Sequence, residues 1–310
     1  MPTLADIEAA RARIAGHVRV TPVITAEAGL FGQDLPVSLK LEFLQHAGSF
    51  KARGAFNNLL SRTVPKAGIA AASGGNHGIA VAHAARALGH PARIFVPTIS
   101  SPVKIAAIEA RGATAVVGGD RYADALAACD AYVTDSGALS VHAYDSEETI
   151  AGQGTLALEW LDQAGPLDTV LVAVGGGGLI AGIARALAGR VRVVGVEPEG
   201  SRCLHAALEA GRPVDVAVDS IAADSLGARR AGDIVFDIAR SDVDHVALVP
   251  ERAISAAQKR LWSTLRIAAE PGGAAALAAL LHGAYRPLPG ERVGVLLCGG
   301  NVAPESLADA

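Results

Sequence analysis

The stretch DTVLVAVGGGGLIAGIARALAG, residues 168–189, contains the pattern that decides the fold. A β-branched apolar run is followed by four consecutive glycines and then by an alanine-rich segment of helical length that ends at Gly189. The pattern predicts a buried strand, a tight turn and a helix with a glycine C-cap. Because helix N-termini attract anions and glycine lets the backbone approach a ligand closely, the turn at residues 175–178 is a candidate phosphate site.

The same strand-to-helix order repeats along most of the chain. Further apolar runs typical of strands lie at residues 68–73, 92–97, 113–117, 138–143, 191–197 and 292–300. Segments typical of helices lie between them at residues 75–89, 101–112, 120–137 and 147–165. Alternation of helices with continuously apolar strands is typical of parallel sheets covered by helices on both faces. We therefore expect an α/β protein.

The length of the chain predicts two subdomains, because 310 residues are many for one hydrophobic core. The alternation indicates an inner block at residues 70–146, which we expect to form a small mobile domain. Residues 1–69 and 147–310 would together form the large domain. Residues 211–233 are the least regular part of the sequence and are expected to be rich in loops.

Composition and charge are those of a globular protein without a nucleic-acid or membrane partner. The chain is 51% hydrophobic and 19% charged, and its net charge of -4 is mild. No apolar run reaches the roughly 18 residues that a bilayer crossing needs, and the N-terminus lacks the order of a signal peptide. Cys129, Cys203 and Cys298 form no CxxC pair, which argues against a disulfide scaffold or a structural zinc site. We expect a cytoplasmic protein.

A lone lysine stands at the start of another predicted helix. In QHAGSFKARGAF, residues 45–56, Lys51 follows the apolar run of residues 37–44 and begins the helical segment of residues 51–60. The positive end of a helix dipole lowers the pKa of an amine, which suits a nucleophile that must lose its proton. A surface lysine whose ammonium extends into solvent is the alternative.

Three more segments place polar groups at predicted helix starts. The loop ASGGNHGIA, residues 72–80, offers several N–H groups at one point, which suits a carboxylate, although Asn76 and His77 could serve only as turn and capping residues. Cys298 lies near the end of the last predicted strand, before a glycine turn, and is either a core filler or a thiol that bonds a ligand ring. Glu270 precedes a proline-led helix, where an acid complements the dipole.

The tetraglycine turn also fits a dinucleotide. Gly176-x-Gly178-x-x-Ala181 satisfies the dinucleotide fingerprint, and Glu197 ends the next predicted strand at the spacing of a ribose-binding acid. From this segment alone, a dinucleotide is at least as well supported as any other phosphate ligand. A purely structural turn is the weakest interpretation, because four glycines cost much conformational entropy.

Taken in order, the motifs resemble those of the fold type II pyridoxal-phosphate enzymes, and within these the threonine/serine dehydratase and serine racemase group. The resemblance covers nearly the whole chain and displaces the dinucleotide interpretation, since both motifs hold phosphate at a strand-to-helix turn. It implies two open, twisted, mostly parallel sheets covered by helices, as in tryptophan synthase β, and a homodimer. The segments that carry it are GSFKARG (48–54), SGGNH (73–77), IAGQGT (150–155), GGGG (175–178), AAEPGGAAA (268–276) and CGGN (298–301).

The resemblance also implies a site for pyridoxal 5'-phosphate and an amino-acid substrate. Lys51 would anchor the cofactor and then remove the Cα proton, so that a β-hydroxy amino acid such as L-threonine or L-serine yields a 2-oxo acid and ammonia. The residues implied to contact the cofactor are Phe50, Lys51, Asn76, Gly175, Gly176, Gly177, Gly178, Leu179, Glu270 and Cys298. The residues implied to bind the substrate are Ser73, Gly74, Gly75, Asn76 and His77.

Gly74 and Cys203 depart from the family pattern. Serine racemases of this group carry at position 74 a serine that acts on the face opposite the lysine, so Gly74 predicts elimination without efficient racemisation. Some relatives bind a divalent cation through positions that are Glu197, Ser201 and Cys203 here. Because a thiol replaces a hard oxygen ligand, no metal is expected.

The substrate side of the site carries further departures. Ala47 replaces a threonine common in the lysine motif, and Ile79-Ala80 replaces Gln-Gly. A bulkier or acidic β-substituent, as in phenylserine or 3-hydroxyaspartate, therefore stays open. A racemase, a β-replacement synthase of the same fold and a non-catalytic binding protein are the remaining alternatives.

Overall fold

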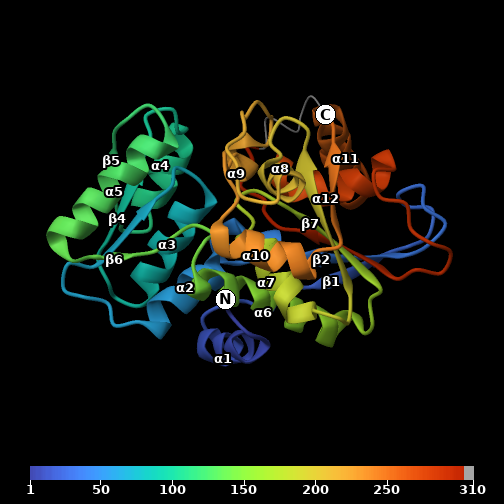
Figure 1. Ribbon diagram of the computed structural model, residues 1–310, viewed down its shortest axis with the longest axis horizontal. Helices are drawn as coiled ribbons and strands as arrows, with labels where there is room; N and C mark the ends of the chain where they lie inside the picture. Colours follow the sequence, from blue (N-terminus) through green and yellow to red (C-terminus); the bar gives the residue numbers. More distant parts are fainter. Residues whose placement is uncertain (304–310) are drawn as a thin grey trace.

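The molecule consists of two lobes, each built on its own sheet (Figure 1). The computed structural model describes residues 1–303. Within this part, six strands form the sheet of the larger lobe and four strands form the sheet of the smaller lobe. Every strand pair except one is parallel, so the predicted α/β fold with two mostly parallel sheets is confirmed.

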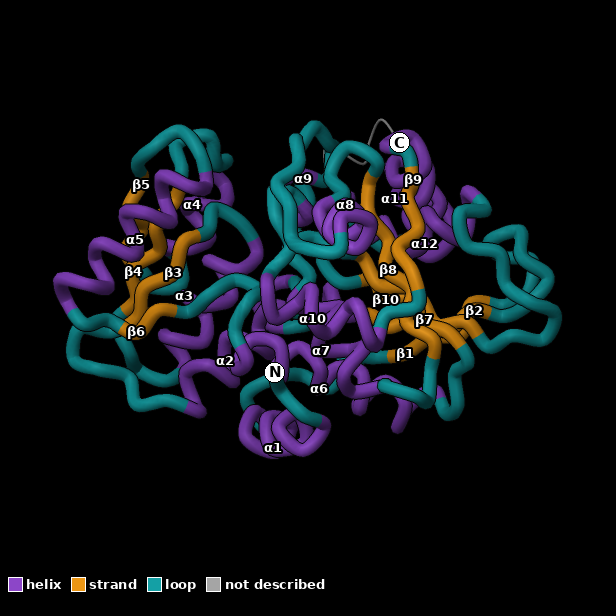
Figure 2. Tube along the Cα trace, viewed as in Figure 1, coloured by secondary structure: helices purple, strands orange, loops and turns teal. Residues whose placement is uncertain are grey.

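The smaller lobe is one continuous part of the chain (Figure 2). Its strands lie in the order β5-β4-β3-β6, and the strand by which the chain arrives, β3, pairs with the strand by which it leaves, β6. The boundaries 70–146 and the mobility of this domain stay predictions. The elements of the lobe are β3 (Ile69–Ala72), α3 (Asn76–Ala87), β4 (Ala92–Val96), α4 (Pro102–Glu109), β5 (Thr114–Val117), α5 (Tyr122–Ser136) and β6 (Leu139–Ser140).

The larger lobe is completed by β10, the last strand within residues 1–303. Its strands lie in the order β1-β2-β10-β7-β8-β9, and only β1 runs antiparallel to its neighbour. The strands are β1 (Val23–Ala26), β2 (Val37–Leu41), β7 (Thr169–Ala173), β8 (Arg192–Pro198), β9 (His245–Val249) and β10 (Val293–Leu297). The helices are α1 (Leu4–Ile14), η1 (Glu42–Leu44), η2 (His46–Gly48), α2 (Lys51–Ser61), α6 (Glu147–Ala164), α7 (Gly178–Leu187), α8 (Cys203–Ala210), α9 (Ala223–Leu226), α10 (Asp233–Asp242), α11 (Glu251–Leu265) and α12 (Pro271–His282).

The predicted strands and helices are found, whereas β1, β9, α1, α8, α9, α10 and α11 have no counterpart among the predictions. β1 is an edge strand in which only Ala26 is fully buried, so it lacks a continuous apolar run. α11 buries a narrow stripe of small and aliphatic side chains on an otherwise polar helix. Apart from Asp233, which begins α10, residues 211–233 contain only the four-residue helix α9, as expected for a loop-rich segment. None of the helices within residues 1–303 has the length and apolar character that a membrane crossing requires.

Three helices of the larger lobe touch at glycines. A Cβ on Gly152 of α6 would lie 2.7 Å from Gly54 Cα of α2, and a Cβ on Gly154 would lie 2.7 Å from the Gly182 carbonyl oxygen of α7. Larger residues would force the helices apart. The two glycines of IAGQGT therefore set how closely α6 holds α2 and α7, whose first turns carry the lysine and tetraglycine motifs.

Two basic and two acidic side chains form a buried charge cluster, Lys40, Glu42, Arg53 and Glu159, beneath the start of α2. Arg53 Nε and Nη2 donate to Glu42 at 2.6 and 3.1 Å, and Arg53 Nη2 donates to Glu159 at 2.9 Å. Lys40 Nζ donates to the other Glu159 oxygen at 2.6 Å. Burial opposes the charge of Arg53, but Glu42 and Glu159 raise its pKa above the ordinary value. The cluster ties β2, η1, α2 and α6 together.

Replacing Arg53 by methionine is expected to lower the free energy of unfolding by about 3–5 kcal/mol, because two buried carboxylates lose their main partner. Urea denaturation followed by circular dichroism measures the change. Arg240→Met is the control, since its ion pair with Asp237 is exposed, and this variant should stay within about 0.5 kcal/mol of the original chain. Equal losses in both variants would contradict the role of the cluster.

Candidate active site

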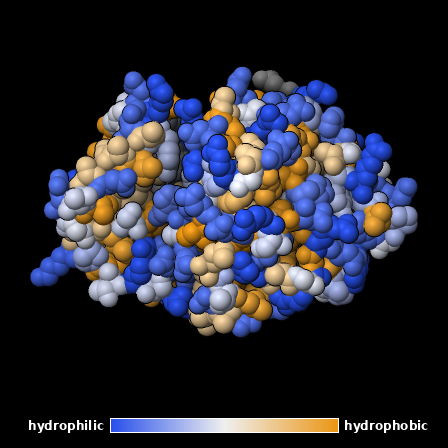
Figure 3. Space-filling model, viewed as in Figure 1, coloured by the Kyte–Doolittle hydropathy of each residue, from blue (hydrophilic) through white to orange (hydrophobic). Residues whose placement is uncertain are grey.

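The carboxyl ends of β2, β10 and β7 bring three predicted motifs to one edge of the larger sheet. Lys51 begins α2 shortly after β2, Cys298 follows β10, and the turn of residues 175–178 follows β7. Ligands of open parallel sheets bind at this edge. The molecular surface is hollowed between the two lobes (Figure 3). The fold therefore brings motifs together that are up to 247 residues apart in the sequence.

The turn that precedes α2 is held against the turn that follows β10. The Phe50 N–H donates to the Cys298 carbonyl at 3.1 Å, and the Gly300 N–H donates to the Gly48 carbonyl at 3.0 Å. Ala47 has φ 62° and Gly48 has φ 74°, so two consecutive residues are left-handed. For an alanine this conformation is unfavourable. The strain is compensated by the hydrogen bonds between the two turns.

The Lys51 amine is partly buried and has few polar neighbours. Its Nζ donates to the Ala143 carbonyl at 2.7 Å and lies 5.2 Å from the centre of the Phe50 ring. Burial lowers the pKa of Lys51 to about 8, although Cys298 and Glu270 act in the opposite direction. The helix dipole suggested by the sequence is thus not the main cause. At neutral pH, about a tenth of the amine is already deprotonated.

Asn76 and Glu270 join the two lobes beside this lysine. Asn76 Nδ2 of α3 donates to Glu270 Oε1 at 2.6 Å, and Asn301 Nδ2 donates to Asn76 Oδ1 at 2.7 Å. Glu270 is the N-cap residue of α12, but its side chain makes no capping bond. Burial raises the pKa of Glu270 to about 7, opposed by the charge of Lys104. Its carboxyl group therefore bonds across the lobes to Asn76 and does not cap the N-terminus of α12.

Three polar groups at this edge are buried without strong partners. Glu270 Oε2 and Ser49 Oγ have no hydrogen-bond partner among residues 1–303. The Cys298 thiol has only a long contact, 3.5 Å, with the Gly272 carbonyl. Burial, reinforced by Glu270, raises the pKa of Cys298, so the thiol is neutral. Because buried polar groups are normally satisfied, these atoms mark a space for a polar ligand.

The tetraglycine turn is closely packed against Tyr144 and leaves no room for side chains. A Cβ on Gly176 would overlap the Tyr144 ring, and a Cβ on Gly178 would lie 2.5 Å from the Tyr144 carbonyl oxygen. Gly177 has φ 94°, a conformation that favours glycine. The next residue, Leu179, is buried in the core and anchors α7. The turn and the N-terminus of α7 thus leave backbone N–H groups free at the edge of the sheet.

The loop of residues 73–77 forms the opposite wall, on the smaller lobe. Ser73 Oγ accepts from the Gly75 N–H at 3.1 Å, and Gly75 is the N-cap of α3 without any side-chain capping bond. The His77 ring is buried, and its Nε2 donates to the Val141 carbonyl at 2.9 Å. Burial and the nearby Lys51 lower the pKa of His77 to about 3, so the ring is neutral. The N–H groups of Gly74, Asn76 and His77 have no hydrogen-bond partner among residues 1–303 and remain open to a carboxylate.

Some residues at the site were not singled out from the sequence. Tyr144 covers the tetraglycine turn, and its position directly after the predicted strand 138–143 is the signal that could have found it. Cys203 was considered from the sequence only as a metal-ligand position, but its Sγ donates to the Gly175 carbonyl at 3.2 Å and helps to hold the turn. Lys104 of α4 forms an ion pair with Asp224 of α9 across the lobes, a contact that no local pattern indicates.

Glu197 caps a helix and does not face the tetraglycine turn as a ribose-binding acid would. Its two carboxylate oxygens accept the N–H groups of Leu204 and His205 at 2.9 and 2.8 Å, at the start of α8. Burial raises the pKa of Glu197 to about 8. Ser201 donates to the Leu226 carbonyl at 2.7 Å. Within residues 1–303, no three His, Cys, Asp or Glu side chains are grouped as metal ligands.

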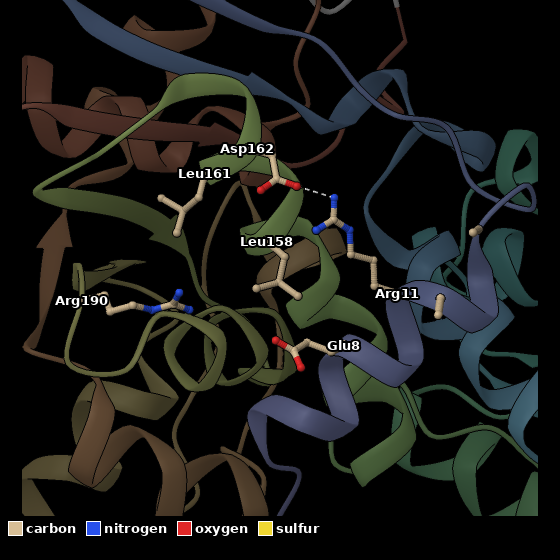
Figure 4. Close-up of a pocket in the computed structure, with 8 residues that line it drawn as sticks. Glu8, Arg11, Leu158, Leu161, Asp162 and Arg190 are labelled. Atoms are coloured by element: carbon tan, nitrogen blue, oxygen red, sulfur yellow. Dashed lines mark hydrogen bonds and ion pairs between the residues drawn. The ribbon is translucent and has the colours of Figure 1, made fainter.

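A surface groove of about 580 Å³ lies between α1 and α6, away from these motifs (Figure 4). Arg11 of α1 and Asp162 of α6 form an ion pair at its wall, and Glu8 and Arg190 supply further charges. None of the site residues predicted from the sequence lines this groove. This groove is therefore separate from the residues predicted to form the functional site.

The Lys51 amine is expected to react with an acetylating reagent with a midpoint near pH 8, because its pKa is about 8 and only the neutral amine is nucleophilic. Competitive labelling of the protein over a pH series, read by mass spectrometry, gives the midpoint. Reactivity should rise as the pH increases through 8. The exposed Lys66 provides an internal comparison in the same sample. A midpoint at the ordinary value of 10.5 would contradict the burial of the amine.

The residues at this edge fit pyridoxal phosphate. A phosphate suits the glycine cradle at the start of α7, an aldehyde suits a lysine of lowered pKa, and a polar ring suits the unpartnered Glu270 and Ser49 atoms and the neutral thiol of Cys298. The fit therefore rests on three independent features: the glycine turn, the lysine amine, and the polar groups without strong partners.

Comparisons with known proteins agree with this fit. Residues 14–299 match the family described as pyridoxal-phosphate dependent enzyme. A phenylserine dehydratase of Ralstonia pickettii is 39% identical over 99% of this chain and 96% of its own length. An L-threonine ammonia-lyase of Geobacter sulfurreducens is 37% identical over 97% of this chain and 76% of its own length. The solved structure of maize serine racemase has a TM-score of 0.93 at 32% identity, covering 99% of this chain and 96% of that one. The chain therefore belongs to the pyridoxal-phosphate dependent enzymes, as its ordered motifs imply.

Proposed function

We propose that this protein is a dehydratase that converts a β-hydroxy amino acid, such as L-threonine or L-serine, to a 2-oxo acid and ammonia. The observation that carries the proposal is the Lys51 amine of lowered pKa beside the neutral Cys298 thiol. The phenylserine dehydratase and L-threonine ammonia-lyase relatives support the same reaction class. Homodimerisation, implied by the resemblance, and a cytoplasmic location, expected from the sequence itself, stay predictions.

In the proposed site, the larger lobe holds the cofactor. The N–H groups of residues 175–178 and Leu179 would bind its phosphate, Phe50 would pack on its ring, and Cys298, with Asn76 of the smaller lobe, would reach its polar atoms. Bound pyridoxal phosphate supplies an electron sink for the bond broken at Cα. A neutral thiol such as Cys298 does not hold a ring nitrogen protonated as a carboxylate would. This weaker sink favours prompt loss of a β leaving group over transamination.

Lys51 has two successive tasks in the proposed reaction. It would hold the cofactor before the substrate binds, and its amine would afterwards be free to act as a base. Because its pKa is about 8, the neutral amine is accessible near neutral pH and removes the Cα proton. The α3 start at residues 73–77 holds the substrate carboxylate, which orients the Cα–H bond toward the lysine. The proton and the β-hydroxyl together leave as water. Hydrolysis of the resulting enamine then takes up one water and releases the 2-oxo acid and ammonia.

The identity of the substrate is tested with purified protein, pyridoxal phosphate and four candidates. These are L-threonine, L-serine, threo-3-hydroxyaspartate and phenylserine. We expect 2-oxo acid and ammonia in equal amounts from at least one of them, and none from Lys51→Ala, because the variant lacks the base. The substrate with the highest kcat/KM then defines the specificity. Absence of oxo acid from all four would refute the dehydratase proposal.

A racemase is the second candidate, since maize serine racemase superposes closely on this chain. Gly74 argues against it, because a glycine supplies no acid–base group on the face opposite Lys51. We therefore expect no appreciable D-serine from L-serine under conditions that produce pyruvate. Chiral chromatography of the residual serine measures it. Accumulation of D-serine at a rate comparable to pyruvate would favour the racemase.

Cofactor affinity is expected to fall at least about tenfold in Gly178→Ala, since the new Cβ would lie 2.5 Å from the Tyr144 carbonyl and displace the turn. Titration of the apo-protein with pyridoxal phosphate, followed in the visible spectrum, gives the dissociation constant. Gly118→Ala is the matched control, because no atom lies within 4 Å of its added Cβ. An unchanged constant in Gly178→Ala would remove the tetraglycine turn from the cofactor site.

A further inference from the structure

The space in front of Gly74 is filled by another residue, Ser100. Gly74 follows β3, and Ser100 lies in the loop that follows β4, the parallel neighbour of β3 in the smaller sheet. A Cβ on Gly74 would overlap the Ser100 hydroxyl, and it would lie 2.8 Å from Ser100 Cβ and 3.3 Å from Val96 Cγ1. The hydroxymethyl group of Ser100 therefore occupies the position of the side chain that Gly74 lacks.

The Ser100 hydroxyl is available to a ligand. The side chain is half-buried, and its Oγ has no hydrogen-bond partner among residues 1–303, although its N–H donates to the Pro97 carbonyl at 3.0 Å. The adjacent Ser101 differs in both respects. Ser101 is exposed, and its hydroxyl accepts from the Lys104 N–H as the N-cap of α4. Only the first of the two serines thus has a hydroxyl that serves no structural bond.

Ser100 lies at the wall of the cleft between the lobes. Gly75, next to Gly74, is the uncapped N-terminus of α3, and a Cβ on it would lie 3.2 Å from the Asp224 carbonyl oxygen of the larger lobe. Lys104, one helical turn beyond Ser100, pairs with the same Asp224. The hydroxyl is therefore close to the N–H groups that the proposed function assigns to the substrate carboxylate.

We propose that Ser100 is a substrate-binding residue whose hydroxyl donates a hydrogen bond to the α-carboxylate held at the start of α3. The inference rests on the proposed function, because that function places the carboxylate there. A serine transfers protons only when a base accepts its own, and no basic side chain is hydrogen-bonded to Ser100 Oγ within residues 1–303. Its role is therefore binding, and it does not restore the racemase chemistry that Gly74 lacks.

Removal of the hydroxyl is the first test. Ser100→Ala is expected to raise KM for the amino-acid substrate roughly ten- to a hundredfold and to change kcat less than about twofold, as for loss of one hydrogen bond to a charged group. Ser101→Ala serves as the control and should keep KM, because its hydroxyl only caps α4. An unchanged KM in Ser100→Ala would overturn the proposal.

Affinity for L-alanine separates this inference from the proposed function. L-Alanine carries the same carboxylate but no β-hydroxyl to lose, so its binding to the holoenzyme can be measured by calorimetry without turnover. A weaker binding in Ser100→Ala supports the inference even if no β-hydroxy amino acid is dehydrated. Equal binding by Ser100→Ala and the original chain refutes it even if the dehydratase proposal holds.

Moving the hydroxyl to position 74 distinguishes hydrogen bonding from space filling. Gly74→Ala alone should lower Tm because of the overlap, and adding Ser100→Gly should restore Tm but leave KM high. Gly74→Ser with Ser100→Gly should restore both, since the hydroxyl returns to nearly the same place. Ser100→Gly is used because even the Cβ of an alanine would lie only 2.8 Å from the new one. A KM that stays high in the double variant Gly74→Ser with Ser100→Gly would overturn the proposal. Formation of D-amino acid that depends on Ser100 would overturn it as well.

Discussion

The position of β10 between β2 and β7 is the constraint on which the site depends. Parallel pairing in register makes the carboxyl ends of all three strands meet at one edge, so that the turns after β2, β10 and β7 converge. Hydrogen bonds from Phe50 to Cys298 and from Gly300 to Gly48 then lock two of these turns together. The buried charge cluster and the glycine contacts among α2, α6 and α7 fix the helices that follow. A lysine, a thiol and a glycine cradle thus share one space although none is near the others in sequence.

Strongly patterned parts of the chain were predictable from the sequence alone. β7 is buried at every position and apolar after Thr169, the tetraglycine turn is unusual, and alanine-rich helices ended by glycines separate the strands. The α/β fold and its order therefore follow from local chemistry. The elements without a counterpart have weaker patterns. β1 is half exposed at an edge, and α11 buries a narrow stripe, because neighbours remote in sequence rather than their own periodicity hold them in place.

Contacts across the lobes could not be predicted in the same way. The sequence suggested that Glu270 complements the dipole of α12, whereas its carboxyl group bonds Asn76 of α3, 194 residues away. The lowered pKa of Lys51 was expected from a helix terminus, but burial is its main cause. Tyr144, Lys104 and Asp224 act through tertiary proximity, for which periodicity and spacing carry no signal. Side-chain environments of this kind depend on how two sheets face each other, and that is a property of the whole fold.

The order of strands in the larger sheet has a consequence for how the protein folds during synthesis. The smaller sheet uses only residues 69–140, and its first and last strands pair directly, so it can form while the rest of the chain is still being made. The larger sheet needs residues 293–297 at its centre, and until they emerge β2 and β7 each expose an unpaired edge. Such non-local pairings form slowly and leave strands open to wrong partners. The nascent chain is therefore most vulnerable to aggregation just before its last strand arrives.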